Sequence, residues 1–243
     1  MASLIKEPYF ISDRLERYLS YLHTYQLSLP EVVTNVNCDI DYPFYTNTKP
    51  SNLSYNYLLL VNKYHYLDND TLPLDLVTMT NEYDNQSGDM LSQIAYSSFQ
   101  RLVNDAEKEE YHIRNNSVYR DYYTQEKVYN SYRTRYRVDY ADRWAARSGY
   151  SEHQTGLSLD VGVANSYNTG VKFENTKEFS WMKDNCYKYG FILRFPKNKE
   201  HLTGVNYESW HYRYVGEDAA TYIYQNDITF EEYYAYFVEK KEK

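Results

Sequence analysis

The chain has 243 residues, a formal net charge of −8, 42% hydrophobic residues and 25% charged residues. This balance is typical of a globular protein with one substantial core. The negative charge argues against a nucleic-acid partner, because no basic field is present to neutralise phosphates. The sequence contains no run of about 18 apolar residues, so we expect no transmembrane segment in this chain. Its first residues also lack the apolar stretch of an export signal.

Two residue types stand out by their number. Tyrosine occurs 32 times against 9 phenylalanines, which reflects either AT-rich coding DNA or a set of stacking surfaces for sugar or peptide. Cysteine occurs only at Cys38 and Cys186, which fit no metal-binding spacing. We expect two free thiols, and one disulfide in an oxidising compartment is the alternative.

The N-terminal part is predicted to be an extension of the main domain. Apolar residues at helical spacing predict a helix over residues 8–29, ended by Pro30. Residues 39–53, with several prolines, asparagines and serines, are typical of a linker. We therefore divide the chain into a partly helical extension, 1–50, and a main domain, 51–243.

The next hundred residues mix helices with short strands. Residues 57–61 are a short apolar run that predicts a strand, and residues 73–88 are predicted to be irregular. A continuous apolar stripe predicts a helix from Met90 to about residue 106. We expect another strand over 111–114 and a long helix over 122–146.

Strands dominate the second half of the prediction. Residues 157–163 alternate apolar and polar, which is the period of a half-buried strand. A helix is expected over 177–189, with Gly190 placed to cap its C-terminus, followed by strands over 191–195 and 210–215. Helices before a strand-rich second half predict an α+β fold with a mainly antiparallel sheet flanked by helices.

Two of the six histidines lie in contexts that suit metal binding. His153 precedes the predicted strand that carries Asp160 on its polar face, and His211 lies in the last predicted strand. Two imidazoles and one carboxylate leave a fourth zinc position open for water, as a catalytic site requires. Glu208 is the candidate for taking a proton from that water. Glu208 and His211 differ in strand parity, so both face one site only if a turn or bulge lies between them.

Taken singly these spacings also occur by chance, but their order resembles a known family. The motifs resemble those of the VanY-like D-alanyl-D-alanine carboxypeptidases and their LD-carboxypeptidase relatives, zinc peptidases of the fold shared with the hedgehog signalling domain. The matching blocks cover about residues 57–216. In chain order they are Val61-Asn62-Lys63, Ser117-Val118-Tyr119-Arg120-Asp121-Tyr122-x-x-Gln125, Ser151-x-His153-x-x-Gly156-x-x-x-Asp160, Gly190-Phe191-Ile192-Leu193-Arg194-Phe195-Pro196, Thr203-Gly204 and Glu208-x-Trp210-His211.

The resemblance implies a role for each of these polar residues. The implied zinc ligands are His153, Asp160 and His211. Glu208 is implied to be the catalytic base. Arg120 is implied to stabilise charge on the scissile carbonyl oxygen or to hold the substrate carboxylate, for which a guanidinium is well suited. The alternative for Arg120 is a salt bridge at the helix start, with Asp121 or Glu126.

Three more residues are candidates for contacts with the substrate. Gln125 and Ser151 are implied to line the substrate site, with ordinary hydrogen bonding in a loop or cap as the alternative. Arg213 shares a predicted strand face with His211, so it is a second candidate for the cation that holds a terminal carboxylate.

The resemblance implies a zinc-dependent D,D-carboxypeptidase that removes the terminal D-alanine from peptidoglycan stem peptides. An L,D-carboxypeptidase acting on the tetrapeptide stem is the alternative. An endopeptidase, a dipeptidase and a catalytically silent peptide-binding module are further alternatives. Because stem peptides lie outside the bacterial membrane, we expect an extracellular, wall-associated or membrane-anchored protein, with an export signal or anchor upstream of residue 1.

Overall fold

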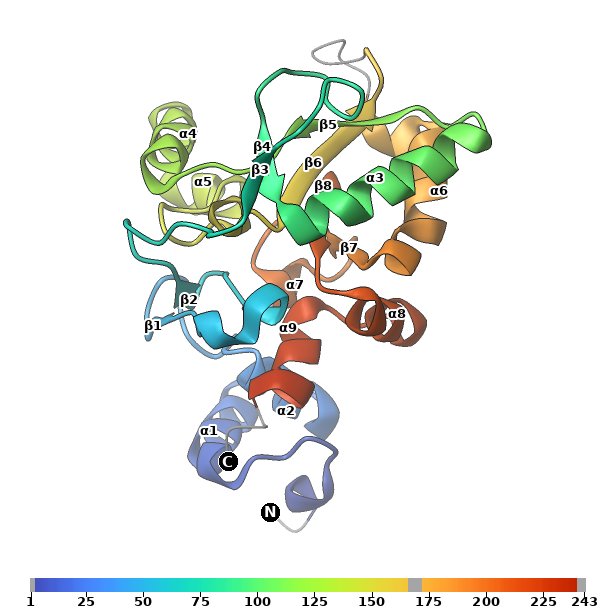
Figure 1. Ribbon diagram of the computed structural model, residues 1–243. Coiled ribbons are helices and arrows are strands. Elements are labelled where there is room, and N and C mark those ends of the chain that lie inside the picture. Colours follow the sequence, from blue (N-terminus) through green and yellow to red (C-terminus); the bar gives the residue numbers. More distant parts are fainter. Residues whose placement is uncertain (1–2, 166–171, 240–243) are drawn as a thin grey trace.

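The centre of the molecule is a four-stranded antiparallel sheet with the strand order β5-β6-β8-β7 (Figure 1). The computed structural model describes residues 3–165 and 172–239. The strands of the sheet are β5 (Ile113–Ser117), β6 (Ser158–Val163), β7 (Phe191–Phe195) and β8 (Glu208–Tyr214). The sheet and the helices around it confirm the predicted α+β class.

One face of the sheet carries the main hydrophobic core. Helices α3 (Gln93–Lys108) and α6 (Lys177–Asn185) contribute to this core together with the sheet (Figure 1). Leu159 and Val161 of β6 point into it and are at most 1% exposed. Asp160, between them, faces the opposite side, as the two-residue period of a strand predicts.

The opposite face is partly covered by the C-terminal helices. These are α8 (Glu217–Asn226), the single turn α9 (Phe230–Tyr233) and a π-helical turn over Tyr234–Val238. A second hydrophobic cluster joins them to Ile192 of β7. Thr229 starts α9 with a capping box. No helix or strand was expected after residue 215, so this layer is absent from the sequence-based prediction.

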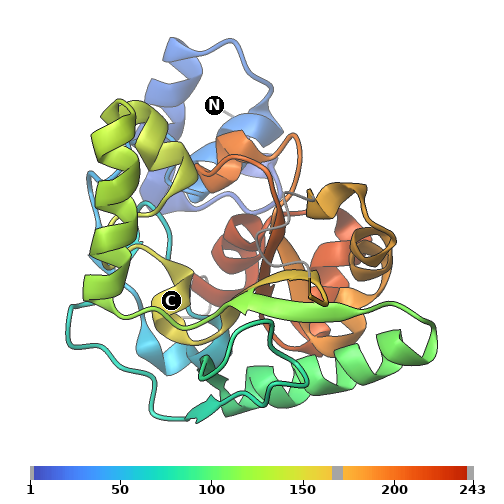
Figure 2. The ribbon, with the colours of Figure 1, turned by 90° about the horizontal axis from the view of Figure 1, so that it is seen from above.

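Two helices replace the single one that was expected over 122–146. Helix α4 (Tyr122–Arg135) begins at the capping side chain of Asp121 and ends at Tyr136, whose backbone is extended. Helix α5 (Val138–Trp144) then turns back, and the Tyr129 hydroxyl of α4 donates to the Asp142 carboxylate of α5 at 2.8 Å. Figure 2 shows α4 and α5 on the opposite side of the molecule from α6.

The N-terminal part also holds two longer helices where one was predicted. They are α1 (Leu15–Thr24) and α2 (Leu29–Asn37), and together they form a separate hydrophobic cluster. Two short 3-10 turns, Leu4–Lys6 and Ser12–Arg14, precede them. The expectation that Pro30 ends a helix is wrong. Pro30 lies in the first turn of α2. Proline is tolerated there because the N–H groups of a first helical turn have no partner within the helix.

The two ends of the described chain lie against each other (Figure 1). The ring of Tyr9 stacks on that of Tyr236, with 3.8 Å between the ring centroids. The Arg14 guanidinium donates to the Glu239 carboxylate at 2.8 Å. The N-terminal helices therefore pack on the last turns of the chain, while the division at residue 50 stays a prediction.

The strand predicted over 57–61 is wrong. A 3-10 helix, Leu53–Leu58, takes up its start, and residues 59–61 are buried outside any strand. The Leu59 carbonyl accepts from the Arg213 guanidinium at 2.7 Å, and the Leu60 carbonyl accepts from the Ser51 hydroxyl at 2.6 Å. Side chains thus satisfy the carbonyl groups that a neighbouring strand would otherwise satisfy.

Two short ladders and several short helices complete the architecture. Strand β1 (Lys49–Pro50) pairs with β2 (His65–Tyr66), and β3 (Leu76–Thr78) pairs with β4 (Met90–Ser92). Strand β3 lies within the segment predicted to be irregular, and β4 delays the start of the helix expected at Met90. The short helices are Glu152–Thr155, Phe173–Asn175, Cys186–Tyr189 and α7 (Glu200–Thr203).

Cys38 and Cys186 are both buried and free, as expected. Within residues 3–165 and 172–239, no helix combines the length and the apolar character that crossing a bilayer demands.

A substitution at Gly190 tests how tightly the chain packs beside β7. Its φ of +80° confirms the predicted helix cap, and a Cβ there would lie 2.7 Å from the Tyr214 ring. Gly88 has a similar φ of +88°, but no atom of the described residues lies within 4 Å of the position of a Cβ there. Alanine at either position carries a left-handed penalty of about 1–2 kcal/mol. We expect Gly190→Ala to lower the free energy of unfolding by about 1–3 kcal/mol more than Gly88→Ala does, because of overpacking. Urea denaturation of both variants measures the difference, and equal losses would contradict it.

Candidate metal centre

The site is built on a direct pair of residues in the central sheet. Asp160 of β6 and His211 of β8 are register partners, so both side chains leave the same face of the sheet. His211 Nδ1 lies 2.9 Å from Asp160 Oδ1. This is the face opposite the α3 core.

His153 reaches the same point from the short helix before β6. That helix, Glu152–Thr155, ends at Gly156, whose φ of +66° turns the chain into the strand. His153 Nδ1 lies 2.5 Å from the Val118 carbonyl oxygen. Because a carbonyl can only accept, Nδ1 carries the hydrogen and Nε2 keeps its lone pair. Nε2 lies 3.4 Å from Asp160 Oδ1.

The three side chains fit a zinc ion. Their ligand atoms all lie within 4.8 Å of one another, and no other such group of three occurs in the part of the chain that is described. Two imidazole nitrogens and one carboxylate oxygen are donors that zinc prefers, and three protein ligands leave a position open.

The charges around these ligands also favour a cation. Burial and the neighbouring Arg120 lower the pKa of His153 to about 4, so its ring is neutral, as a ligand must be. Burial alone would raise the pKa of Asp160, but the two histidines hold it well below the usual range. Burial works against a charged His211, but hydrogen bonds to Asp160 and Glu152 outweigh it and raise its pKa to about 9. The site thus attracts positive charge.

Glu208 stands at the start of β8 and faces the same pocket as His211. The ladder between β7 and β8 pairs Leu193 with Tyr212 and Phe195 with Glu208, so β8 contains two extra residues. The strand is irregular at this point, and Glu208 and His211 both line the pocket although they differ in strand parity. Burial, with a further contribution from Asp160, raises the pKa of Glu208 to about 7, although nearby positive charges oppose the shift. A buried carboxyl of this kind is suited to exchange a proton near neutral pH.

Arg120 is held in the pocket by Gln125 and Ser117, and its Nη1 also lies 3.7 Å from Asp160 Oδ2. Its Nε donates to Gln125 Oε1 at 3.0 Å, and its Nη1 donates to the Ser117 hydroxyl at 2.7 Å. Gln125 Nε2 donates in turn to the Ala146 carbonyl at 2.8 Å. The guanidinium is therefore oriented before any substrate arrives.

The alternative of a helix-start salt bridge finds no support. Among the hydrogen bonds and ion pairs of the described residues, Arg120 contacts neither Asp121 nor Glu126. Asp121 instead accepts from the Thr124 N–H at 2.6 Å and caps α4.

These residues share one pocket with a volume of about 320 Å³. That size is near the lower end for sites that take small ligands. Seven of the predicted site residues line it, namely Arg120, Gln125, Ser151, His153, Asp160, Glu208 and His211. Lining residues that were not predicted include Lys63, Tyr132, Trp144, Tyr150, Phe195 and Trp210.

Arg213 is not brought to the pocket. Its side chain is fully buried, and its Nη1 donates to Glu152 Oε1 at 2.9 Å. Its Nη2 donates to the carbonyl groups of Tyr57 and Leu59. The guanidinium thus lies behind His211 and is occupied by other groups of the protein.

Two buried charges of the site were missed at the level of sequence. Lys63 lines the pocket, donates to the Tyr45 hydroxyl and the Asp142 carbonyl, and has its pKa lowered to about 7 by burial. Glu152 lies behind His211 and is 4% exposed. Two features of the sequence could have identified these residues. Lys63 belongs to one of the blocks that resemble the family, and Glu152 is adjacent to His153.

Comparison with known proteins agrees with this geometry. The VanY family profile, described as D-alanyl-D-alanine carboxypeptidase, matches residues 88–217. The chain belongs to the VanY family. It is 38% identical over 183 residues to YodJ of Bacillus subtilis, covering 74% of this chain and 67% of YodJ. It is 37% identical over 192 residues to a D-alanyl-D-alanine carboxypeptidase of Enterococcus faecium, covering 76% of this chain and 59% of that relative. The VanY-like chain thus spans about two thirds or less of these relatives.

Solved structures show the same relationship. The LdcB LD-carboxypeptidase superposes with a TM-score of 0.71 at 36% identity, covering 78% of this chain and 90% of LdcB. VanYB in complex with D-alanine-D-alanine has a TM-score of 0.63 at 30% identity, covering 73% of this chain and 96% of VanYB. A VanY D,D-pentapeptidase variant in complex with Zn(II) has the same score and identity.

The raised pKa of Glu208 can be observed in metal-free protein. We expect its carboxyl to titrate near pH 7 rather than near 4.5, because burial favours the neutral form. The stability that this proton provides is fully present below about pH 4.5 and is lost as the pH rises through 7. Carbon-13 NMR of the carboxyl groups, with Glu208→Gln to assign the signal, measures the midpoint. A midpoint near 4.5 would show that the carboxylate is solvated.

Proposed function

We propose that this chain is a zinc-dependent D,D-carboxypeptidase that removes the terminal D-alanine from peptidoglycan stem peptides. The observation that carries the proposal is the convergence of His153, Asp160 and His211 in one pocket beside Glu208 and Arg120. Membership of the VanY family and the named relatives support the same reaction. A silent binding module is disfavoured, because the proposed ligands and the proposed base are all present.

His153, Asp160 and His211 hold the zinc ion in this proposal. His153 offers Nε2, because its Nδ1 is engaged by the Val118 carbonyl, and His211 offers Nδ1, which faces Asp160. Bound zinc supplies a Lewis acid that lowers the pKa of water and polarises the scissile carbonyl.

Glu208 is the proton carrier of the reaction. Its carboxylate takes the proton of the attacking water and then delivers it to the amine of the departing D-alanine. Burial in the pocket supports this role, because a carboxyl that is not strongly solvated accepts a proton readily near neutral pH.

Arg120 is placed to meet negative charge on the substrate. With Nε and Nη1 engaged by Gln125 and Ser117, its guanidinium stands fixed at the edge of the pocket. A fixed cation stabilises the carbonyl oxygen as it becomes negative, or binds the terminal carboxylate. Ser151 lines the same pocket and can hydrogen-bond to the peptide. Arg213 has no contact with substrate in this proposal.

The L,D-carboxypeptidase reaction is the second candidate. The likeness to LdcB, with a TM-score of 0.71, favours it. A dipeptidase reaction is a third, because the chain is 31% identical to a bifunctional D-Ala-D-Ala dipeptidase and carboxypeptidase of Enterococcus gallinarum, VanXYC. For the two stem-peptide substrates the protein works outside the bacterial membrane, where stem peptides are found.

Because a zinc ligand and a catalytic base have separate roles, we expect their substitutions to differ in their effects on zinc content and activity. We expect Glu208→Gln to retain one zinc per chain and lose activity by about 10²–10⁴-fold, because a proton carrier is removed while the ligands remain. His211→Ala should lose both zinc and activity. Elemental analysis and turnover of a D-Ala-D-Ala peptide measure the two effects, with the half-exposed Glu217→Gln as the control. Release of zinc by Glu208→Gln would make Glu208 a ligand instead.

Peptide substrates test the reaction itself. We expect a pentapeptide ending in D-Ala-D-Ala to lose one D-alanine, and its C-terminally amidated form to react at least about 10²-fold more slowly, because the Arg120 guanidinium in the pocket is then left without a carboxylate partner. Mass spectrometry of the digests measures both rates. Cleavage of the tetrapeptide stem alone would establish the L,D reaction, and release of two alanines from free D-Ala-D-Ala the dipeptidase. Equal cleavage of amidated peptides would rule out an exopeptidase that is anchored by the terminal carboxylate.

A further inference from the structure

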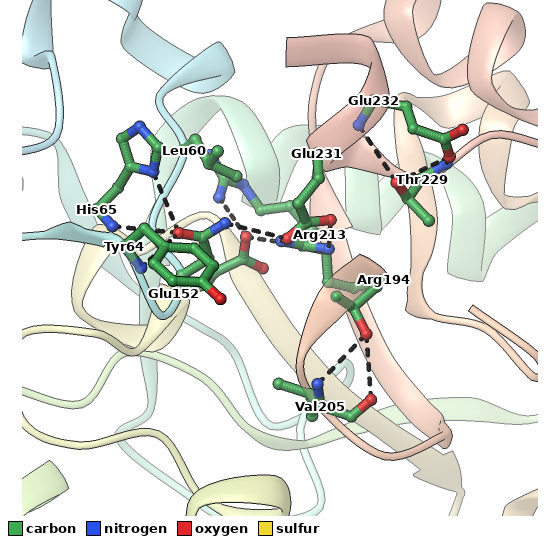
Figure 3. A network of polar contacts seen from close by, with 12 residues as sticks. Leu60, Tyr64, His65, Glu152, Arg194, Val205, Arg213, Thr229, Glu231 and Glu232 are labelled. Carbon is green, nitrogen blue, oxygen red and sulfur yellow. Dashed lines mark hydrogen bonds and ion pairs between the residues drawn. The ribbon is translucent and has the colours of Figure 1, made fainter. Parts of the chain in front are cut away.

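Four buried charged side chains form a chain of ion pairs next to the metal ligand His211, and Figure 3 shows these four residues, namely Glu231, Arg194, Glu152 and Arg213. Arg194 of β7 donates through Nε to Glu152 Oε1 at 2.8 Å. Arg213 of β8 donates through Nη1 to the same oxygen at 2.9 Å. The two terminal nitrogens of Arg194 donate to the carboxylate of Glu231 in α9 at 2.8 and 2.6 Å. None of the four residues is more than 4% exposed.

The network leaves one oxygen of Glu152 for His211. Both guanidinium donors contact Oε1, while Oε2 lies 3.5 Å from His211 Nε2. Both of these atoms are buried, and neither has another hydrogen-bond partner among the residues that the structure describes. Since a buried polar atom without a partner is unfavourable, the two atoms satisfy each other. A ring hydrogen of His211 then sits on Nε2, and Nδ1 is the nitrogen that faces Asp160, where a bound zinc ion would take the place of the Nδ1 hydrogen.

We propose that Glu152 is the positioning residue of the metal ligand His211, and that Arg194, Arg213 and Glu231 hold Glu152 in place. By accepting the Nε2 hydrogen, Glu152 keeps the coordinating nitrogen at Nδ1 and fixes the plane of the ring. Carboxylate partners of this kind orient metal-bound histidines and raise their basicity. The inference rests on the proposed zinc site and adds to it the residues that determine its affinity.

The charges of the network support a functional rather than a stabilising purpose. Two carboxylates face two guanidiniums, so the network is close to neutral, and the two guanidinium donors on Glu152 Oε1 favour its carboxylate form. Buried ion pairs are often no more stabilising than apolar side chains of the same size. Their benefit here is a carboxylate that cannot rotate. Arg213 is itself anchored to the carbonyl groups of Tyr57 and Leu59.

Glu152→Gln tests the inference because it inverts the hydrogen-bond pattern without changing the size of the side chain. Arg194 and Arg213 both need an acceptor at the position of Oε1, so the amide oxygen must take it. The amide NH2 then faces His211 and requires an acceptor at Nε2, which places the ring hydrogen on Nδ1. That hydrogen occupies the position of the coordinating lone pair.

The measurement is the zinc dissociation constant of the purified full chain, from competition with a chromophoric chelator. We expect Glu152→Gln to weaken zinc binding by about 10–100-fold. The control is Glu178→Gln, another buried glutamate at 4% exposure, which accepts from the backbone of His112 away from the metal. It should bind zinc as the unchanged chain does. Equal affinity of Glu152→Gln and the unchanged chain would overturn the proposal.

Two further readouts separate positioning from general stability. Urea denaturation of the metal-free variants shows whether Glu152→Gln still folds. If it does not fold, Glu231→Gln decides, because this substitution loosens Arg194 from α9 without touching His211. Unchanged zinc affinity in Glu231→Gln would overturn the proposed support of Glu152.

Nitrogen-15 NMR of the zinc-loaded unchanged chain should show His211 protonated at Nε2, and zinc on Nε2 would also overturn the proposal. Failure of the unchanged chain to bind zinc would instead refute the proposed function.

Discussion

The pairing of Asp160 with His211 across β6 and β8 is the contact on which the site depends. The backbone ladder of the two central strands places the residues opposite each other and brings their ligand atoms to 2.9 Å. A slip of one residue would turn His211 into the α3 core and bring Tyr212, now fully buried there, to the site. The hydrophobic face of the sheet therefore enforces the register that the metal centre needs.

Burial and neighbouring charges together determine the protonation state of each polar residue of the site. Desolvation favours the protonated form of Glu208, while the neighbouring histidines favour the ionised form of Asp160. The same low-dielectric surroundings keep His153 neutral. One carboxyl group of the pocket, Glu208, thus favours its protonated form, and the other, Asp160, favours its ionised form. This difference is expected of a proton carrier and a metal ligand.

The periphery of the fold supports this centre through its C-terminal helices. Glu231 of α9 binds Arg194, and the following π-helical turn carries Tyr236, on which Tyr9 of the N-terminal part stacks. Arg14 and Lys49 both contact the Glu239 carboxylate at the end of the described chain. The N-terminal helices are therefore linked by packed side chains to the network behind His211.

The sequence by itself determined the alternation that places Asp160 opposite the core, the apolar stripe of α3 and the order of the family motifs, because these are local patterns of side-chain chemistry. The break between α4 and α5 and the buried position of Arg213 were decided only by the tertiary structure. Their causes are contacts such as Tyr129 with Asp142 and Arg213 with Glu152, whose partners lie apart in sequence. Periodicity predicts the face of an element on which a residue lies, but the partner it meets depends on how the elements pack.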